Sequence, residues 1–436
     1  MEEDNNDCPK YKNQYSSLLI ESKNIILRGA PGTGKTYLAK EIATDIVSNG
    51  CVDDYKKLND EQKQQIEFVQ FHQSYDYTDF VEGLRPRFNN DGSVGFELQD
   101  GIFKAFVDKA RKNYENSKKP IDAIEKEIPI QKAIDEFFSN IELGVDKFKT
   151  KRGSEFIITG IENERIYISI PSNLKANNIL LSRDKLEKML ESNFDFELND
   201  IKDFFKYARR MQEHSYYLAL YKEIKELCSK NKILPTDVKK EELKNYVFII
   251  DEINRGEISK IFGELFFAID PGYRGENGSV KTQYANLHIS SDERFYIPEN
   301  VYIIGTMNDI DKSIDSFDFA MRRRFRFINL KANERLEMLD SLSDNIKNEA
   351  IQRMTSLNNA IVDIEDLNEN YQIGASYFLK LQTLSFDQLW TDYLKPLLQE
   401  YIQGMYDEKN IMKKFEQAYG YKEKDLGDAN EDGLHQ

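Results

Sequence analysis

Residues 29–36, Gly-Ala-Pro-Gly-Thr-Gly-Lys-Thr, are the feature that most restricts how this 436-residue chain can fold. They match the pattern GxxxxGK[ST], directly after an apolar run at residues 24–28 and before helical apolar spacing at residues 36–47. Glycines let a backbone wrap a phosphate group, and the start of the following helix adds positive partial charge. The sequence therefore predicts a strand, a phosphate-binding loop and a helix in succession.

Further apolar runs are typical of buried strands, at residues 66–71, 246–250, 301–306 and 325–330. Because they alternate with helical stretches, we expect an α/β fold with a parallel five-stranded sheet covered on both faces. The second and third strands are too far apart for one crossover, so the chain must contain an inserted α+β module between them. Helices follow the last strand and predict a C-terminal helical lid.

These patterns divide the chain into a leader, a core, an insert, a lid and a polar disordered tail. The expected boundaries are 1–22 for the leader, 23–114 and 241–330 for the α/β core, 115–240 for the inserted α+β module, 331–425 for the helical lid and 426–436 for the tail. Within the insert we expect helices at residues 122–143, 182–194 and 200–227, and a hairpin at residues 155–170.

Two adjacent carboxylates, Asp251 and Glu252, follow the third strand. Strand ends of this kind lie beside the phosphate loop in an open α/β sheet. Lys35 is expected to reach the β- and γ-phosphates, while Thr36 and Asp251 hold Mg²⁺. Glu252 is expected to act as a general base on the attacking water. The residues expected to bind the nucleotide are Gly29, Ala30, Pro31, Gly32, Thr33, Gly34, Lys35, Thr36, Tyr37 and Asp251.

Asn308 ends the fourth strand, where it is expected to orient the attacking water or contact the γ-phosphate. Arg322, Arg323 and Arg324 precede the fifth strand. Three such arginines fit a solvated surface, a partner-binding patch or an arginine finger that stabilises transition-state charge. Beside a phosphate loop we favour the finger, and a finger from a neighbouring subunit would make hydrolysis depend on assembly.

Bulk composition excludes several function classes. The formal net charge of −16 disfavours nonspecific coating of DNA. Cys8, Cys51 and Cys228 have no CxxC spacing, so neither a zinc site nor a disulfide framework is predicted. No apolar run approaches the roughly 20 residues that span a bilayer, and the N-terminus lacks a signal-peptide core. We expect a cytoplasmic protein without a membrane partner.

Several long segments resemble the McrB family of AAA+ proteins. They are residues 71–86 (FHQSYDYTDFVEGLRP), 248–255 (FIIDEINR), 295–308 (FYIPENVYIIGTMN) and 373–378 (IGASYF, similar to a lid motif IGHSYF). The resemblance implies a hexameric ring with active sites between subunits, hydrolysis of GTP, and a McrC-like nuclease subunit that acts on DNA carrying modified cytosines. It places the finger at Arg323, with Arg324 as the close rival.

The chain departs from the family at three points. Lys312 stands where the McrB family has an arginine. Because a lysine ammonium cannot replace the planar guanidinium of arginine, both GTP and ATP are candidate substrates. Ala375 stands where histidine is usual. Well-known family members carry a DNA-recognition domain before the motor, where this chain has its short leader. We therefore expect DNA recognition by the insert, by a partner or by a separately encoded neighbour.

The favoured function is therefore an NTP-hydrolysing motor that drives DNA translocation and activates a separate nuclease subunit, since this sequence carries no nuclease motif. The alternatives are an ATP-dependent MoxR-like remodelling chaperone and an NTP-switched defence signalling module.

Two smaller features are interpreted as structural. The inserted module could recognise DNA through its basic residues Lys147, Lys149, Lys151 and Arg152, but we favour a packing or regulatory role for this module. Phe71, Tyr75, Tyr77 and Phe80 are predicted core residues, and His72 a hydrogen-bonded core histidine.

Overall fold

The computed structural model describes residues 11–88, 94–162, 165–171, 178–192, 194–207, 209–228, 240–288, 292–310 and 319–421. Cys8, Lys312 and the predicted tail 426–436 lie outside the described residues. The chain divides into two compact units. The core unit comprises Met1–Ala110, Lys244–Val280 and Phe295–Gln436, and the inserted unit Arg111–Leu243 and Lys281–Arg294. The domain boundaries expected from the sequence stay a prediction.

The core unit is built on a five-stranded sheet in the order β11-β1-β10-β9-β2, with every neighbouring pair parallel. Its strands are β1 (Asn24–Gly29), β2 (Ile66–Gln70), β9 (Tyr246–Asp251), β10 (Val301–Asn308) and β11 (Arg326–Leu330). The three central strands β1, β10 and β9 are buried along nearly their whole length. The predicted parallel five-stranded sheet is confirmed, and its continuous apolar runs reflect cover on both faces.

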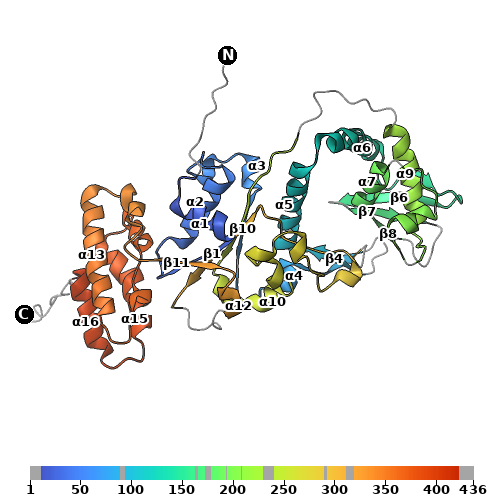
Figure 1. Ribbon diagram of the computed structural model, residues 1–436. Coiled ribbons are helices and arrows are strands. Elements are labelled where there is room, and N and C mark those ends of the chain that lie inside the picture. The colour runs from blue at the N-terminus through green and yellow to red at the C-terminus, as the bar shows by residue number, and fades with distance from the viewer. Residues whose placement is uncertain are drawn as a thin grey trace, which may run out of the picture. The chain divides into compact units, whose positions relative to one another are not determined.

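Each face of this sheet has its own packing (Figure 1). Helices α1 (Gln14–Ser22) and α2 (Lys35–Val47) cover one face, where Ile25 and Leu27 of β1 pack with Leu38 and Ile42 of α2. On the other face, the Phe248 ring of β9 lies 4.9 Å from Phe103 and 5.8 Å from Phe80, both edge-on. Aromatic pairs of this kind stabilise beyond their buried area.

The segment after β2 supplies part of that aromatic face. Phe71, Tyr77 and Phe80 are buried, as predicted, whereas Tyr75 is half-buried, and this burial raises the pKa of Tyr75 to about 12. His72 is exposed, so its prediction as a core histidine is wrong; it lies two residues after Gln70, the last residue of β2, where the chain has left the sheet. An antiparallel hairpin, β3 (Glu82–Phe88) with β4 (Val94–Asp100), comes next and was not predicted.

The remaining helices of the core unit frame the sheet and form the lid. The shorter ones are α3 (Asp60–Lys63), α4 (Tyr77–Phe80), α10 (Ile258–Phe262), α11 (Leu265–Ala268) and α12 (Phe319–Arg322), and the long α5 (Ile102–Lys118) leads toward the inserted unit in sequence. The lid contains α13 (Asp344–Val362), α14 (Phe386–Leu389), α15 (Lys395–Ile402) and α16 (Glu408–Tyr419). Trp390, Phe378 and Tyr419 are fully buried at its centre, which confirms the predicted helical lid.

The inserted unit has a separate apolar core between a four-stranded antiparallel sheet and helices, which confirms an α+β module. Its elements are α6 (Ile121–Asn140), β5 (Lys147–Lys149), β6 (Glu155–Glu162), β7 (Arg165–Ser169), β8 (Asn178–Ser182), α7 (Arg183–Glu191), α8 (Asp200–Phe204) and α9 (His214–Cys228). The predicted hairpin is the β6–β7 pair. The single helix predicted over residues 200–227 is wrong: Lys206 adopts a left-handed φ of 54° just after α8 ends.

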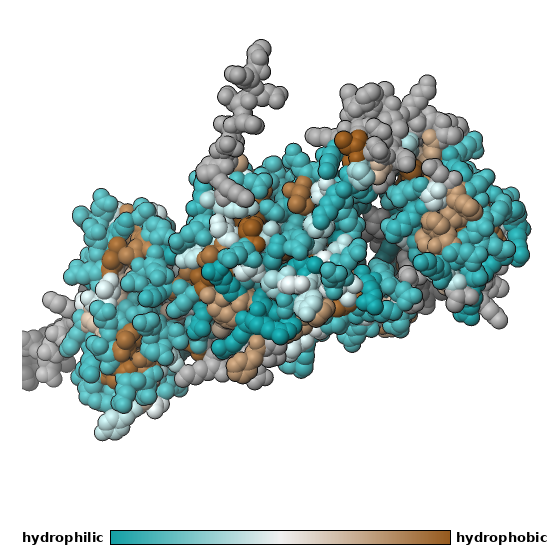
Figure 2. Space-filling model, viewed as in Figure 1, coloured by the Kyte–Doolittle hydropathy of each residue, from teal (hydrophilic) through white to brown (hydrophobic). Residues whose placement is uncertain are grey.

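The surface matches the charged composition. Figure 2 shows a mainly hydrophilic face with scattered apolar patches, and Asp, Glu, Lys and Arg make up 31% of the sequence. In the part of the chain that the structure describes, no helix is long and apolar enough to cross a membrane.

Candidate nucleotide site

The phosphate loop turns tightly between β1 and α2. Gly32 and Gly34 have φ angles of 78° and 80°, in the left-handed region that side chains disfavour, and Gly34 caps the N-terminus of α2. The Thr33 hydroxyl donates to the carbonyl of Ala30 at 3.0 Å, which closes the turn from within. The loop therefore has the conformation that its glycines predicted, at the start of a 13-residue helix.

Lys35 lies inside the curve of this loop and is only 7% exposed. Its Nζ donates to the carbonyls of Gly29 and Ala30, at 3.0 and 2.9 Å. These bonds hold a buried ammonium group at the loop, which is the charge that a phosphate group requires. Tyr37, in the first turn of α2, is 59% exposed and leaves its ring accessible beside the loop.

The magnesium-binding pair predicted from the sequence lies together in the structure. Thr36 Oγ1 donates to Asp251 Oδ1 at 2.7 Å, which joins the start of α2 to the carboxyl end of β9. Two oxygen donors at this spacing fit Mg²⁺, which binds through one or two protein oxygens plus substrate phosphates. Within the residues that the structure describes, no group of three or more His, Cys, Asp or Glu side chains is placed to hold a metal ion.

Thr306 is a site residue that the sequence analysis missed. Its hydroxyl donates to Asp251 Oδ1 at 2.6 Å and accepts from the backbone N–H of Glu252 at 3.1 Å. The signal was present, because residues two apart on a strand share a face and Thr306 precedes Asn308 by two. A buried hydroxyl on that face was therefore predictable as a neighbour of the acidic strand end.

Glu252 is held in an unusual backbone conformation beside Asn308. Its φ of 51° and ψ of 44° are left-handed, which costs a residue with a side chain about 1–3 kcal/mol. Glu252 Oε1 accepts from Asn308 Nδ2 at 2.6 Å, and Oε2 lies 3.3 Å from Arg255 Nε. Such strain persists where surrounding contacts fix it, and here an amide and a guanidinium aim the carboxylate.

The lid contacts the phosphate loop directly, which the sequence did not reveal. The backbone N–H of Gly374 donates to the carbonyl of Pro31 at 2.9 Å, and that of Ser376 to Gly32 at 3.0 Å. A Cβ built on Gly374 would overlap the Gly32 carbonyl, so only glycine fits. The lid segment 373–378 therefore lies against the loop that the sequence assigned to phosphate.

The arginines before β11 differ sharply in exposure. The Arg323 side chain is 68% exposed, whereas that of Arg324 is 6% exposed, with its guanidinium 4.6 Å from the Phe266 ring centroid. Arg322 is exposed like Arg323. Arg324 is thus packed within this chain, while Arg323 lies at its surface.

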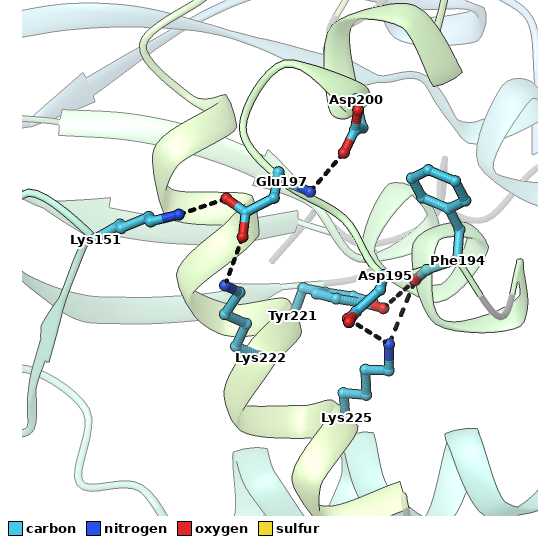
Figure 3. Close-up of polar contacts among 8 residues, drawn as sticks. All are labelled: Lys151, Phe194, Asp195, Glu197, Asp200, Tyr221, Lys222 and Lys225. Atoms are coloured by element: carbon cyan, nitrogen blue, oxygen red, sulfur yellow. Dashed lines mark hydrogen bonds and ion pairs between the residues drawn. The ribbon is translucent and has the colours of Figure 1, made fainter.

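Three of the four basic residues named from the sequence in the inserted unit, Lys147, Lys149 and Lys151, lie beside carboxylates. Glu155 lies 3.6 Å from Lys147 and 3.3 Å from Lys149. Figure 3 shows Glu197 between Lys151 and Lys222, at 2.6 and 3.5 Å. In the same view, Lys225 Nζ lies 2.9 Å from Asp195 Oδ1 and also reaches the carbonyl of Phe194. Because Glu155 and Glu197 are each shared by two lysines, these ion pairs offset part of the positive charge that DNA recognition would use.

Comparison with known proteins agrees with this geometry. The family model of the McrB alpha-helical lid domain matches residues 349–410, and that of the AAA domain (dynein-related subfamily) matches residues 195–325. The chain is 26% identical over 397 residues to the Type IV methyl-directed restriction enzyme EcoKMcrB subunit of Escherichia coli (strain K12), covering 88% of this chain and 54% of that protein.

A shorter similarity links residues of this chain to the Type II restriction enzyme BsuMI component YdiS of Bacillus subtilis (strain 168), at 31% identity over 103 residues, 22% of this chain and 30% of that protein. The sheet order, the phosphate loop, the acidic strand end and the helical lid define an AAA+ P-loop NTPase. The chain is a McrB-like AAA+ protein. It spans about half the length of the Escherichia coli relative.

Proposed function

We propose that this chain is the NTP-hydrolysing subunit of a ring-forming, McrBC-like DNA restriction complex. The single observation that carries the proposal is a set of hydrogen bonds at one edge of the sheet, beside the loop that holds Lys35. Thr36 and Thr306 both donate to Asp251, at 2.7 and 2.6 Å, and Asn308 donates to Glu252 at 2.6 Å. The similarity to a protein described as a methyl-directed restriction enzyme subunit supports the restriction role.

Each group has a distinct part in the proposed hydrolysis. Lys35 binds the β- and γ-phosphates, and Thr36 and Asp251 hold a Mg²⁺ ion that neutralises phosphate charge when bound. Glu252 accepts the proton of the attacking water. Asn308 holds Glu252 Oε1 at 2.6 Å and so keeps the carboxylate aimed at that water.

Arg323 is the proposed finger, acting on the site of a neighbouring subunit. Its exposure supports this choice over Arg324, whose side chain is buried against Phe266 and Asp270. A finger acting between identical subunits requires head-to-tail contacts, which close into rings. We propose that the ring is a hexamer. Arg322, the other exposed arginine of this turn, is the alternative candidate for the arginine finger.

The partners and the substrate follow from the family resemblance. We propose GTP as the nucleotide, with ATP as the alternative. A McrC-like nuclease subunit would be the partner, DNA would be engaged through the complex, and the protein would work in the cytoplasm. Turnover of GTP against ATP, measured with and without DNA and the nuclease encoded next to this chain, decides the nucleotide. Hydrolysis of ATP alone, unaffected by DNA and by that nuclease, would contradict the restriction role.

Mixing two inactive variants tests the shared site. Arg323→Ala keeps its own Lys35 and Glu252, and Glu252→Gln keeps its own arginine. Each alone should be inactive, and an equal mixture should recover about a quarter of the unsubstituted turnover if subunits combine at random in a ring.

Arg322→Ala is the matched control, since Arg322 is exposed on the same turn, and it should hydrolyse normally. Mixed assemblies that form but stay inactive would contradict the arrangement in which arginine and base come from different subunits.

A further inference from the structure

We infer that Asn24, the first residue of β1, is a positioning residue that sets the place of Arg323 at the subunit surface. This inference rests on the proposed function, in which Arg323 acts on a neighbouring subunit. Asn24 lies at the opposite end of β1 from Gly29, where the phosphate loop begins. It therefore touches none of the groups that bind the nucleotide in its own subunit.

The Asn24 amide is fully buried and bonded on both sides. Its Nδ2 donates to the carbonyl of Arg324 at 2.9 Å and to that of Ile269 at 2.7 Å. Its Oδ1 accepts from Arg274 Nη2 at 2.6 Å. An amide offers two donors and an acceptor in one plane, so a single side chain joins the start of β1, the 269–274 segment and the arginine turn.

Arg274 makes this junction costly to break. It is 5% exposed, and burial lowers its pKa to about 10, which leaves it charged at neutral pH. The carboxylates of Glu299 and Asp270 favour its charged form. A buried cation that loses a hydrogen-bond acceptor pays a desolvation penalty, so Asn24 is held firmly in one orientation.

The same segment also holds the arginine turn through side chains. Asp270 Oδ2 lies 3.8 Å from Arg324 Nε and 4.0 Å from Arg323 Nε. The backbone N–H of Arg324 donates to the carbonyl of Met321 at 2.9 Å. With the carbonyl of Arg324 bonded to Asn24 and its side chain buried, the turn is fixed on its inner side, next to the exposed Arg323.

Asn24→Asp tests this role because it keeps the shape and the acceptor for Arg274. It replaces the two donated bonds with a carboxylate oxygen facing two carbonyls. We expect nucleotide affinity within about twofold of the unsubstituted protein, and turnover slower by about tenfold to a hundredfold, the range that a misplaced catalytic group produces.

The decisive measurement mixes Asn24→Asp with Glu252→Gln, beside the mixture of Arg323→Ala with Glu252→Gln. If Asn24 acts through the arginine, both mixtures recover turnover, because a sound arginine from the Glu252→Gln subunit reaches the intact site of its neighbour. Recovery in the Arg323 mixture alone would overturn the role of Asn24. Recovery in neither would refute the shared site itself, and the inference with it.

Asn300→Asp is the matched control. Asn300 is 2% exposed and its Nδ2 bridges the carbonyls of Ala110 and Lys244, at 3.2 and 2.9 Å, away from the arginines. It should lower the melting temperature without the deficit that mixing repairs. If Asn24→Asp does not fold, Asn24→Ala, which removes the donors without adding charge, takes its place in the same mixtures. Unchanged turnover in a folded Asn24 variant would also overturn the inference.

Discussion

Thr306 ties together the two carboxylates on which the site depends. Its hydroxyl bonds to Asp251 Oδ1, the proposed magnesium ligand, and to the backbone N–H of Glu252, the proposed base. Because Glu252 has a left-handed backbone, it needs such outside contacts to stay in place. A small hydroxyl residue on β10 therefore shapes a site whose charged members lie on β9 and α2.

Separate residues should control binding and turnover. Lys35→Ala is expected to abolish nucleotide binding, because it removes the ammonium group that donates to the loop carbonyls of Gly29 and Ala30. Glu252→Gln should bind nucleotide normally and turn over about 10²–10⁴-fold more slowly. Calorimetric titration and steady-state rates check both.

Lys40→Ala is the control for Lys35, since it lies on the same helix α2 with its Nζ over the Phe68 ring, away from the loop. It should bind and hydrolyse nucleotide normally. Unaltered affinity in Lys35→Ala would refute the assignment of the phosphate loop.

At the scale of elements, the lid and the phosphate loop meet backbone to backbone. Gly374 and Ser376 donate to consecutive carbonyls, those of Pro31 and Gly32. The Tyr377 ring and the Met338 sulfur lie against the positions where Gly32 and Gly34 lack side chains. A shift of the lid segment should therefore displace the phosphate loop as well, because these close contacts leave no room for either segment to move alone.

Gly374→Ala should weaken nucleotide binding without unfolding the lid. The new Cβ would overlap the Gly32 carbonyl, so the loop or the lid segment has to shift. We expect affinity to fall about tenfold or more, since distortion of a preformed site costs about 1–3 kcal/mol. Nucleotide titration and thermal unfolding measure the two effects separately.

Gly160→Ala is the comparison, because a Cβ there meets nothing closer than Tyr167 at 3.7 Å. It should leave nucleotide affinity unchanged. If Gly374→Ala binds nucleotide as the unsubstituted protein does, the lid segment does not constrain the loop.

At the scale of the whole molecule, two compact units of different architecture occur in one chain. The core unit carries the parallel sheet and the lid, and the inserted unit has its own antiparallel sheet and apolar centre. In the inserted unit, Lys147 and Lys149 lie beside Glu155, Lys151 beside Glu197 and Lys225 beside Asp195. This pairing supports a packing or regulatory role for the insert over DNA reading.

Replacing Lys147, Lys149 and Lys151 together by glutamine should change the DNA affinity of the assembly by about twofold at most. Nearby carboxylates offset part of the charge of these lysines, and we expect the lysines to contact no phosphate. The salt dependence of binding should therefore keep its slope, because that slope counts the phosphates neutralised. Binding measured over a series of salt concentrations checks this.

Lys188→Gln, which removes another exposed ion pair of the same unit, serves as the reference for loss of one such pair. A large loss of affinity in the triple variant, together with a shallower slope, would show that the insert contacts DNA.

The sequence alone determined the parallel sheet, the phosphate loop, the two carboxylates of β9 and the helical lid. Each depends on short-range information: an apolar run, a glycine pattern, or a polar residue directly after a strand. The single helix predicted over residues 200–227 was wrong, because α8 ends at Phe204 and Lys206 then adopts a left-handed φ that no local sequence pattern predicted. His72 failed for a similar reason, because burial depends on where a strand ends in the fold.

Only the tertiary structure decided how distant segments meet. Asn24 bonds to the carbonyl of Arg324, Gly374 bonds to Pro31, and Thr306 bonds to Asp251, and each pair is separated by tens to hundreds of residues. It also separated Arg323 from Arg324, which are adjacent in sequence but exposed and buried respectively. Local patterns indicate which groups a chain carries, whereas their bonds depend on how strands and turns pack across its whole length.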